Sequence, residues 1–308
     1  MNEHTAIRKF DVTATLACIG TLSAWSLGPI FISYLAGFVD SWTQNLLRYS
    51  AACLFWLPLL LFSLKKKRFD NRIWKKALLP ATANVIMQSL WAAAFYYVGP
   101  AFMVLLTKTN IIWVASFSLM FFPEERPLAR SKRFWAGLVL SALGVVGVIY
   151  FKEDFAATGT LTGVIIAMAA AFMWGAYTIS VKITFRDVSS REGFSVISAY
   201  TVAGLAVAAL LFGDIGRCVT MGVWQWASVV FSGVTAIALG HVFYYAAIKR
   251  IGATIPALVI LAQPFAVLAI SRVVFGESLN VLQLLFGAIL LVGAGLAIWA
   301  QQHLRRQP

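Results

Sequence analysis

The sequence predicts an all-α polytopic membrane protein with ten transmembrane helices, arranged as two inverted repeats of five. Three observations lead to this prediction: the composition, the lengths of the apolar runs and the one-sided distribution of Lys and Arg. Apolar residues make up 60% of the 308 residues and charged residues 12%, whereas a soluble domain carries about 25% charged residues. This composition excludes a soluble globular domain and a disordered chain, and three cysteines exclude a disulfide scaffold.

Ten apolar runs are long enough for one crossing each, which takes about 20 residues. The runs cover 12–37, 42–64, 74–98, 101–122, 134–151, 159–183, 194–212, 224–248, 254–275 and 281–300. Gly99 and Pro100 separate the third run from the fourth, since about 50 residues would be too long for a single crossing. Runs of this length also argue against a β-barrel, whose strands alternate over about ten residues.

The Lys and Arg residues fall almost entirely on one side of the predicted membrane. With the N-terminus in the cytoplasm, 20 of the 25 fall in cytoplasmic segments, and only Lys152 and Arg217 fall in external ones. Cytoplasmic loops collect Lys and Arg, so this distribution supports ten crossings with both termini cytoplasmic. The net charge of +13 therefore indicates contact with lipid headgroups and not with nucleic acid.

The two halves of the chain resemble each other. Trp25 in LSAWSLGPIF corresponds to Trp174 in AFMWGAYTIS. An offset of 153 residues pairs Gly99 with Gly252, Gln88 with His241, Asn110 with Gln263, Phe122 with Phe275, and Glu124 with Glu277. Five crossings in each half is an odd number, so the second half enters the membrane in the opposite orientation. Inverted repeats are typical of alternating-access carriers, which bind substrate between the halves near mid-membrane.

Ten spans in two halves, Arg48 at the start of RYSAA, and the Pro-Glu-Glu and Gly-Glu turns before the last span of each half resemble the EamA type of the drug/metabolite transporter superfamily. Within it the chain is most similar to the YddG-type aromatic amino acid exporters. The resemblance implies a first EamA repeat at 1–151 and a second, inverted one at 152–308. It also implies a multi-pass protein of the bacterial inner membrane that exports aromatic and other bulky amino acids, and related metabolites, by alternating access.

Polar and ionisable residues inside spans are costly, which makes them candidates for substrate binding. Together with aromatic residues that suit a cavity wall, the candidates are Trp25, Asn84, Gln88, Trp91, Thr107, Lys108, Asn110, Trp174, Tyr177, His241, Tyr244 and Gln263. No Asp or Glu falls in the core of a predicted span. We therefore expect facilitated diffusion, exchange, or coupling through His241 in place of carboxylate-based ion coupling.

Helical spacing groups several of these candidates. Asn84, Gln88 and Trp91 share one face of the third span, and His241 and Tyr244 share one face of the eighth; interhelical hydrogen bonding is the alternative role for the polar members. The π faces of Trp25, Trp174 and Tyr177 suit an aromatic group or a cationic amine, with ordinary helix packing as the alternative.

The centre of the fourth span holds the strongest polar candidates. Lys108 lies too deep to reach either interface, so it neutralises a substrate carboxylate or bonds to helix carbonyls. Asn110 lies about 200° away around a continuous helix, so only one of the two faces the cavity unless the helix is unwound; Thr107 shares the face of Asn110. Gln263, before a proline, occupies the matching place in the ninth span, where freed carbonyls could bind an ammonium. Arg48 is expected to stabilise the fold.

Efflux of drugs, nucleobases or quaternary amines by the same superfamily is the alternative function. A channel is less favoured, because no span carries a continuous polar stripe. No enzymatic activity, cofactor or metal is expected, since HExxH, GxSxG and paired-carboxylate patterns are missing from the sequence. The expected partners are a small-molecule substrate, the lipid bilayer and, through the Gly-rich fifth and tenth spans, a second copy of the chain.

Overall fold

A computed structural model of the chain describes residues 11–65, 72–152, 158–185, 190–251 and 254–304. Within these ranges the regular elements are all helical, and ten segments are long and apolar enough to cross a membrane. The predicted fold class and number of spans are confirmed.

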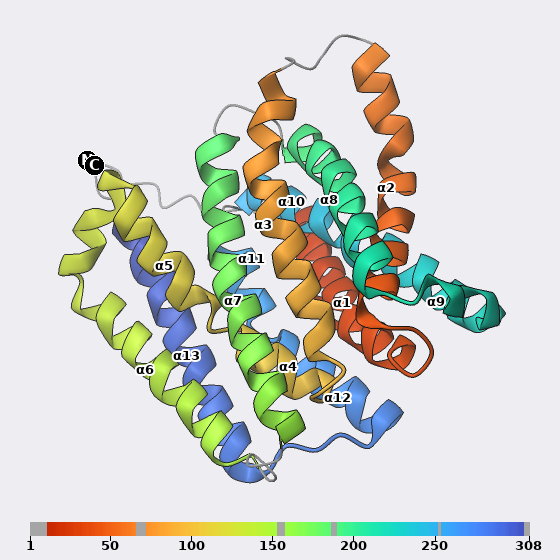
Figure 1. The fold of residues 1–308 in the computed structure, drawn as a ribbon. Coiled ribbons are helices and arrows are strands. Elements are labelled where there is room, and N and C mark those ends of the chain that lie inside the picture. The colour runs from red at the N-terminus through yellow and green to blue at the C-terminus, as the bar shows by residue number, and fades with distance from the viewer. Residues whose placement is uncertain (1–10, 66–71, 153–157, 186–189, 252–253, 305–308) are drawn as a thin grey trace.

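The helices follow one another in two sets of five spans. The first half holds α1 (Val12–Leu35), α2 (Ser41–Lys65), α3 (Arg72–Ala94), α4 (Pro100–Thr107) with α5 (Asn110–Phe121), the short η1 (Pro123–Arg130) and α6 (Lys132–Tyr150). The second half holds α7 (Thr158–Thr184), α8 (Ser190–Phe212), the short η2 (Ile215–Thr220), α9 (Val223–Ser232) with η3 (Gly233–Leu239) and α10 (Gly240–Ile251), α11 (Thr254–Ile260) with α12 (Gln263–Phe275), and α13 (Val281–Leu304). In Figure 1, α2 ends and α3 begins at the top, whereas α6 ends and α7 begins at the bottom, so the two helices of each pair run in opposite directions.

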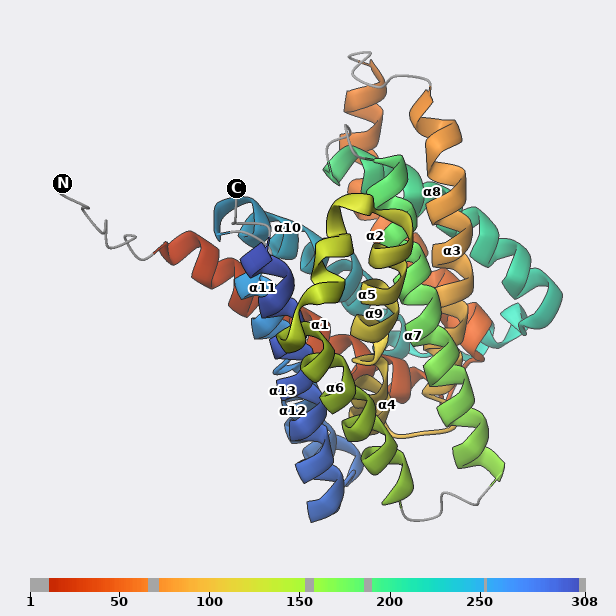
Figure 2. The ribbon, with the colours of Figure 1, turned by 90° about the vertical axis from the view of Figure 1, so that its left-hand side faces the viewer.

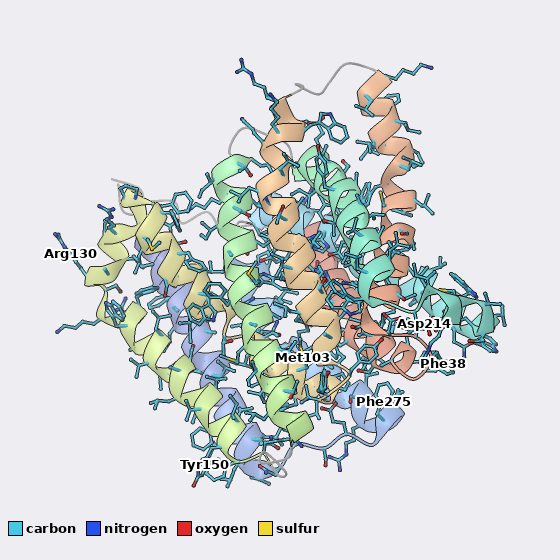
Figure 3. The ribbon with its side chains drawn as sticks, in the orientation of Figure 1. Phe38, Met103, Arg130, Tyr150, Asp214 and Phe275 are labelled. Carbon is cyan, nitrogen blue, oxygen red and sulfur yellow. The ribbon has the colours of Figure 1, made fainter. Side chains whose placement is uncertain are left out.

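The last spans of the two halves, α6 and α13, pack against each other along their lengths (Figures 1 and 2). Glycines allow this close approach, because a Cβ on Gly137 would lie 2.7 Å from the backbone nitrogen of Ala297. The small-residue faces are thus used inside the chain, and a dimer through these helices would need their outer faces. Those outer faces are apolar, as the 76% exposed Tyr150 at the periphery in Figure 3 illustrates.

The helix α4 forms the centre of the main apolar core. All eight of its residues are buried, including Met103, which lies inside the bundle in Figure 3. It packs between α12, α7 and α1, and its own N-terminal N–H groups therefore need an acceptor inside the protein.

Glu277, after α12 in the other half, supplies that acceptor. Its carboxylate oxygens accept hydrogen bonds from the backbone N–H groups of Ala101 at 2.9 Å and Phe102 at 3.1 Å. The hydroxyl of Ser271 donates to the same carboxylate. Gly99 leaves room for it, since a Cβ there would collide with the carboxylate. A carboxylate at a helix N-terminus is electrostatically favourable, so this contact fastens the two halves together at one end of the molecule.

Two spans are interrupted at repeat-related positions. One break lies at Lys108 and Thr109, between α4 and α5, and the other lies 153 residues later at Leu261 and Ala262, between α11 and α12. At both breaks the two backbone N–H groups donate to carbonyls three residues earlier, at 3.1 to 3.2 Å. The eighth span has a different irregularity, the π-helical turn η3, and α3 in the matching place is continuous.

Candidate substrate cavity

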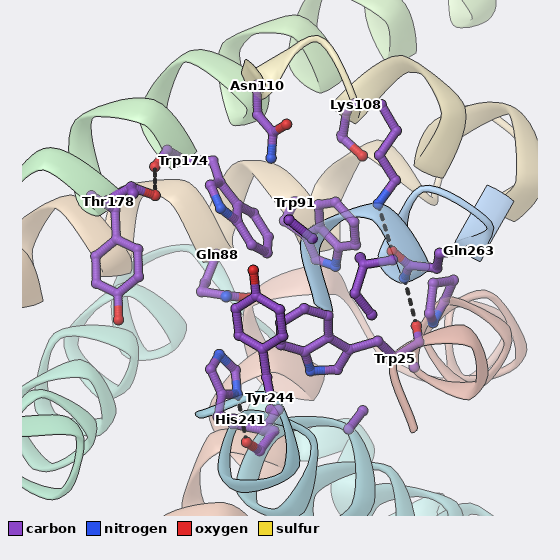
Figure 4. A pocket seen from close by; sticks show the side chains of 18 of the residues that line it. Trp25, Gln88, Trp91, Lys108, Asn110, Trp174, Thr178, His241, Tyr244 and Gln263 are labelled. Atoms are coloured by element: carbon purple, nitrogen blue, oxygen red, sulfur yellow. Dashed lines mark hydrogen bonds between the residues drawn. The ribbon is translucent and has the colours of Figure 1, made fainter. Parts of the chain in front are cut away.

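A cavity of about 440 Å³ lies between the two halves, next to both helix breaks. Its size falls within the usual range for small-molecule sites, about 300–1,000 Å³. Eleven of the twelve candidate residues line it, and most are labelled in Figure 4: Trp25, Gln88, Trp91, Thr107, Lys108, Asn110, Trp174, Tyr177, His241, Tyr244 and Gln263.

Asn84 is the exception, because it is not among the residues that line the cavity. Its amide nitrogen donates to the hydroxyl of Thr201 on α8 at 2.9 Å, and both side chains are buried. Asn84 shares a helical face with Gln88 but lies about 6 Å further along α3. The helices α3 and α8 pack against each other, and Asn84 makes the kind of interhelical hydrogen bond that the sequence gives as its alternative role.

Aromatic rings form much of the cavity wall. The Trp25 ring lies edge-on to the His241 ring with centroids 5.3 Å apart, and 5.0 Å from the Tyr244 ring. Across the cavity, the rings of Trp91 and Trp174 lie 5.8 Å apart. Indole and phenol rings at this spacing offer a slot with π faces, which suits a flat apolar group.

The helix breaks bring Lys108 and Asn110 to the same cavity. A continuous helix would have pointed only one of them inward, but the turn at 108–109 lets both line the wall (Figure 4). The Lys108 ammonium donates to Gln263 Oε1 at 2.8 Å, and Gln263 Nε2 donates to the carbonyl oxygen of Trp25 at 2.7 Å. These two bonds link the fourth, ninth and first spans at the middle of the molecule.

His241 lies directly after the π turn, with a defined ring orientation. Its Nδ1 donates to the carbonyl oxygen of Ile237 at 2.7 Å, and Phe194 stacks on the ring at a centroid distance of 4.7 Å. The bond at Nδ1 fixes the tautomer of the neutral ring, so Nε2 is the acceptor. Gly240 permits the close contact with Trp25, since a Cβ there would lie 2.5 Å from the indole nitrogen.

Arg48 also lines the cavity, although the sequence suggested only a role in the fold. It is 3% exposed, and its Nε donates to the hydroxyl of Ser232 at 2.9 Å. Its charge within a span was the signal that could have identified it. Tyr49 and Thr178 line the wall as well; Thr178 lies one helical turn after Trp174 and therefore on the same face.

The cavity wall combines cations, amides and hydroxyls with aromatic rings. Its lining residues, all within the described part of the chain, include no Asp or Glu, and the same part holds no group of three His, Cys, Asp or Glu side chains suited to a metal ion. Arg48 and Lys108 can neutralise an anionic group, and the amides of Gln88 and Asn110 can donate or accept.

Comparison with known proteins shows that the sequence matches a transporter family along most of its length. The model of the EamA-like transporter family matches residues 12–150 and again residues 161–299. Two relatives, from Haemophilus influenzae and Clostridium kluyveri, are described as uncharacterized transporters. The first is 25% identical over 58% of this chain and 59% of its own length, so the match leaves about two fifths of that relative unaligned. The second is 23% identical over 80% of this chain and 79% of its own length.

The fold also occurs in a solved crystal structure. It superposes with a TM-score of 0.63 over 94% of this chain and 98% of the other, at 16% sequence identity. At that identity the likeness concerns the fold alone.

Proposed function

Because the chain belongs to the EamA-like transporter family, it is a multi-pass membrane transporter, and we propose that it exports aromatic and other bulky amino acids and related carboxylates. We further propose that it resides in a bacterial inner membrane with both termini in the cytoplasm, as the positive-inside pattern of its loops supports. We also propose that the chain consists of one repeat at residues 1–151 and an inverted repeat at residues 152–308, and that it forms a homodimer.

The observation that carries the proposed substrate class is the combination of an aromatic slot with two cations, Arg48 and Lys108, in one cavity. The rings of Trp25, Trp91 and Trp174 offer apolar surface and π faces, and Lys108 lines the same cavity. A solute with a flat side chain and a carboxylate satisfies both features at once. The cavity volume of about 440 Å³ leaves room for an aromatic amino acid.

We propose alternating access as the mechanism. Glu277 joins the two halves at the end that the proposed topology assigns to the outside. The cavity residues on α5, α7 and α10 follow these helices toward the cytoplasmic end. Substrate would enter from the cytoplasm, and a rocking motion of the halves about the breaks would open the outer end. Such a motion requires the bonds of Glu277 to Ala101 and Phe102 to break and reform.

Counterflow in proteoliposomes tests the proposal directly. Vesicles preloaded with unlabelled phenylalanine, without ion gradients, are expected to accumulate labelled phenylalanine. Trp174→Ala should reduce the initial rate about tenfold or more, since it removes a wall of the slot. Trp224→Ala is the matched control, because Trp224 lies outside the cavity and is 76% exposed. Absence of counterflow with phenylalanine and with the other aromatic amino acids would refute the proposed substrate class.

Efflux of cationic amines is the second candidate, favoured by the same aromatic rings. Arg48 and Lys108 oppose it, since both place positive charge where the amine would bind. Competition of labelled phenylalanine by phenethylamine, which has the same ring but no carboxylate, separates the two. Stronger competition by phenethylamine than by phenylalanine would favour amine efflux.

A further inference from the structure

Two cations share the cavity, and neither forms an ion pair with an acidic residue in the part of the chain that the structure describes. Arg48 comes from α2 and Lys108 from the break between α4 and α5, and both line the cavity. The basic residues that do form ion pairs among the described residues are Lys182, Arg217 and Arg250. A charge inside a membrane protein is costly unless it is paired, so both cations are placed to be neutralised by a ligand.

The hydrogen-bond partners of the two cations are neutral. Arg48 donates through Nε to the Ser232 hydroxyl, and Lys108 donates to the amide oxygen of Gln263. A hydroxyl and an amide oxygen orient these cations but leave their charge uncompensated. The fork of Arg48 opposite Nε lies beside Gly28, whose Cβ would be 3.9 Å from an Nη atom, and Gly28 is itself on the cavity wall.

The backbone adds little to the net charge at the cavity. Each break joins the C-terminal end of one helix to the N-terminal start of the next, α4 to α5 and α11 to α12. The partial negative and positive charges of these ends largely cancel. His241 on the opposite wall adds no negative charge in either protonation state. With Arg48 and Lys108 protonated and His241 neutral, the side-chain charge of the cavity is +2.

From this charge count we propose that the cavity selects aromatic acids with a net negative charge, with Arg48 and Lys108 as its two anion-binding residues. This inference rests on the proposed function and narrows it. A zwitterionic amino acid leaves the cavity as positive as before, whereas an aromatic acid without an ammonium group, such as a 2-oxo acid or an N-acylated amino acid, offsets one charge. An ammonium group would also lack a carboxylate partner on the cavity wall.

Binding of three ligands that share one phenyl ring tests this inference. Isothermal titration calorimetry on the purified full chain compares 3-phenylpropionate, phenylalanine and phenethylamine, which are an anion, a zwitterion and a cation at pH 7. We expect 3-phenylpropionate to bind at least about tenfold more tightly than phenylalanine, and phenethylamine to bind most weakly, because charge-assisted hydrogen bonds are the strong ones.

Variants test whether Arg48 and Lys108 cause the preference for the anionic ligand. Arg48→Gln and Lys108→Gln should each weaken 3-phenylpropionate binding about tenfold and change phenylalanine binding less. Arg48→Lys keeps the charge and should retain most of the preference. Arg272→Gln is the matched control, since it removes an exposed positive charge from α12, away from the cavity. Should Arg48→Gln fail to fold after losing its bond to Ser232, Lys108→Gln and Arg48→Lys still test the inference.

The outcomes separate this inference from the proposed function. Phenylalanine binding as tightly as 3-phenylpropionate, with loss of binding in Trp174→Ala, overturns the inference and leaves the proposed function standing. Equal loss of both ligands in Lys108→Gln also overturns it. Failure of all three ligands to bind the unmodified protein overturns the proposed function and this inference together.

Discussion

Replacing Glu277 should weaken the contact that joins the two halves at the N-terminal end of α4. In Glu277→Ala, the N–H groups of Ala101 and Phe102 lose their acceptors. Both residues are almost fully buried, so neither N–H group gains a water partner easily. The variant therefore leaves the first turn of α4 unsatisfied, which is destabilising in a buried helix.

The size of this effect follows from the number of bonds. A hydrogen bond to a charged group contributes about 1.5–3 kcal/mol, and the half-buried position of Glu277 favours the lower end of that range. Two bonds then give about 3 kcal/mol of destabilisation. This corresponds to a fall in the midpoint of thermal unfolding of about 6–12 °C in a chain of a few hundred residues. Glu277→Gln keeps an amide oxygen as acceptor, so its unfolding midpoint should lie between those of the unmodified protein and Glu277→Ala.

Thermal unfolding of the detergent-purified protein measures the change. Asp214→Asn is the control: Asp214 also lies at this end, but its ion pair with Arg217 is exposed on both sides and contributes little. A second readout is the labelling rate of Ala101→Cys by an impermeant maleimide, after replacement of Cys18, Cys53 and Cys218. Labelling should accelerate in Glu277→Ala. An unfolding midpoint within about 1 °C of the unmodified protein would show that the contact does not hold the halves together.

Three further predictions concern stability and the shape of the slot. Asn84→Ala should lower the free energy of unfolding by about 1–3 kcal/mol through the orphaned Thr201 hydroxyl, yet leave ligand affinity within about twofold, as titration calorimetry would measure; a large loss of affinity would return Asn84 to the binding site. Gly240→Ala should displace the Trp25 ring, because its Cβ would lie 2.5 Å from the indole nitrogen, and should weaken aromatic ligands about tenfold; unchanged affinity would place Trp25 outside the slot. At Asp40, which lies outside the spans, burial raises the pKa, but hydrogen bonds from Thr43, Asp214 and Trp42 outweigh it and lower the pKa on balance. The stabilisation from this carboxylate is therefore present above the unfolded value of about 3.9 and is lost as the pH falls through the lower folded value; the unfolding midpoints of the unmodified protein and Asp40→Asn should converge there, and a constant difference down to pH 3 would contradict this.

Much of the architecture could be predicted from the sequence, because bilayer thickness sets the length of each apolar run and topology sets the side of each Lys and Arg. The same reasoning found most of the cavity wall, since polar residues inside spans have few other uses. Repeat symmetry extended it to Gln263, the counterpart of Asn110.

The other features of the site could not be predicted, because helical periodicity gives neither the position of a residue along the membrane normal nor the place where a helix breaks. The helical spacing of Asn84 and Gln88 indicates only which face of the helix they share. Asn84 lies one turn before Gln88 and bonds to Thr201 on α8, whereas Gln88 lines the cavity. No proline adjoins the break at Lys108, so the sequence does not predict it. The break before Gln263 is followed by Pro264, which indicates an interrupted helix. The sequence predicts a structural role for Arg48, and the structure shows it both bonded to Ser232 and on the cavity wall.

The bond between Lys108 and Gln263 has a consequence for biosynthesis. The two residues are 155 positions apart in the chain, so at about 5–20 residues per second the ribosome delivers Gln263 roughly 8–30 s after Lys108. During that interval Lys108 lacks its hydrogen-bond acceptor, because Gln263 has not yet been synthesised. The kink in the fourth span is therefore expected to mature only after the ninth has been synthesised, which makes the first half an incomplete folding unit when it emerges alone.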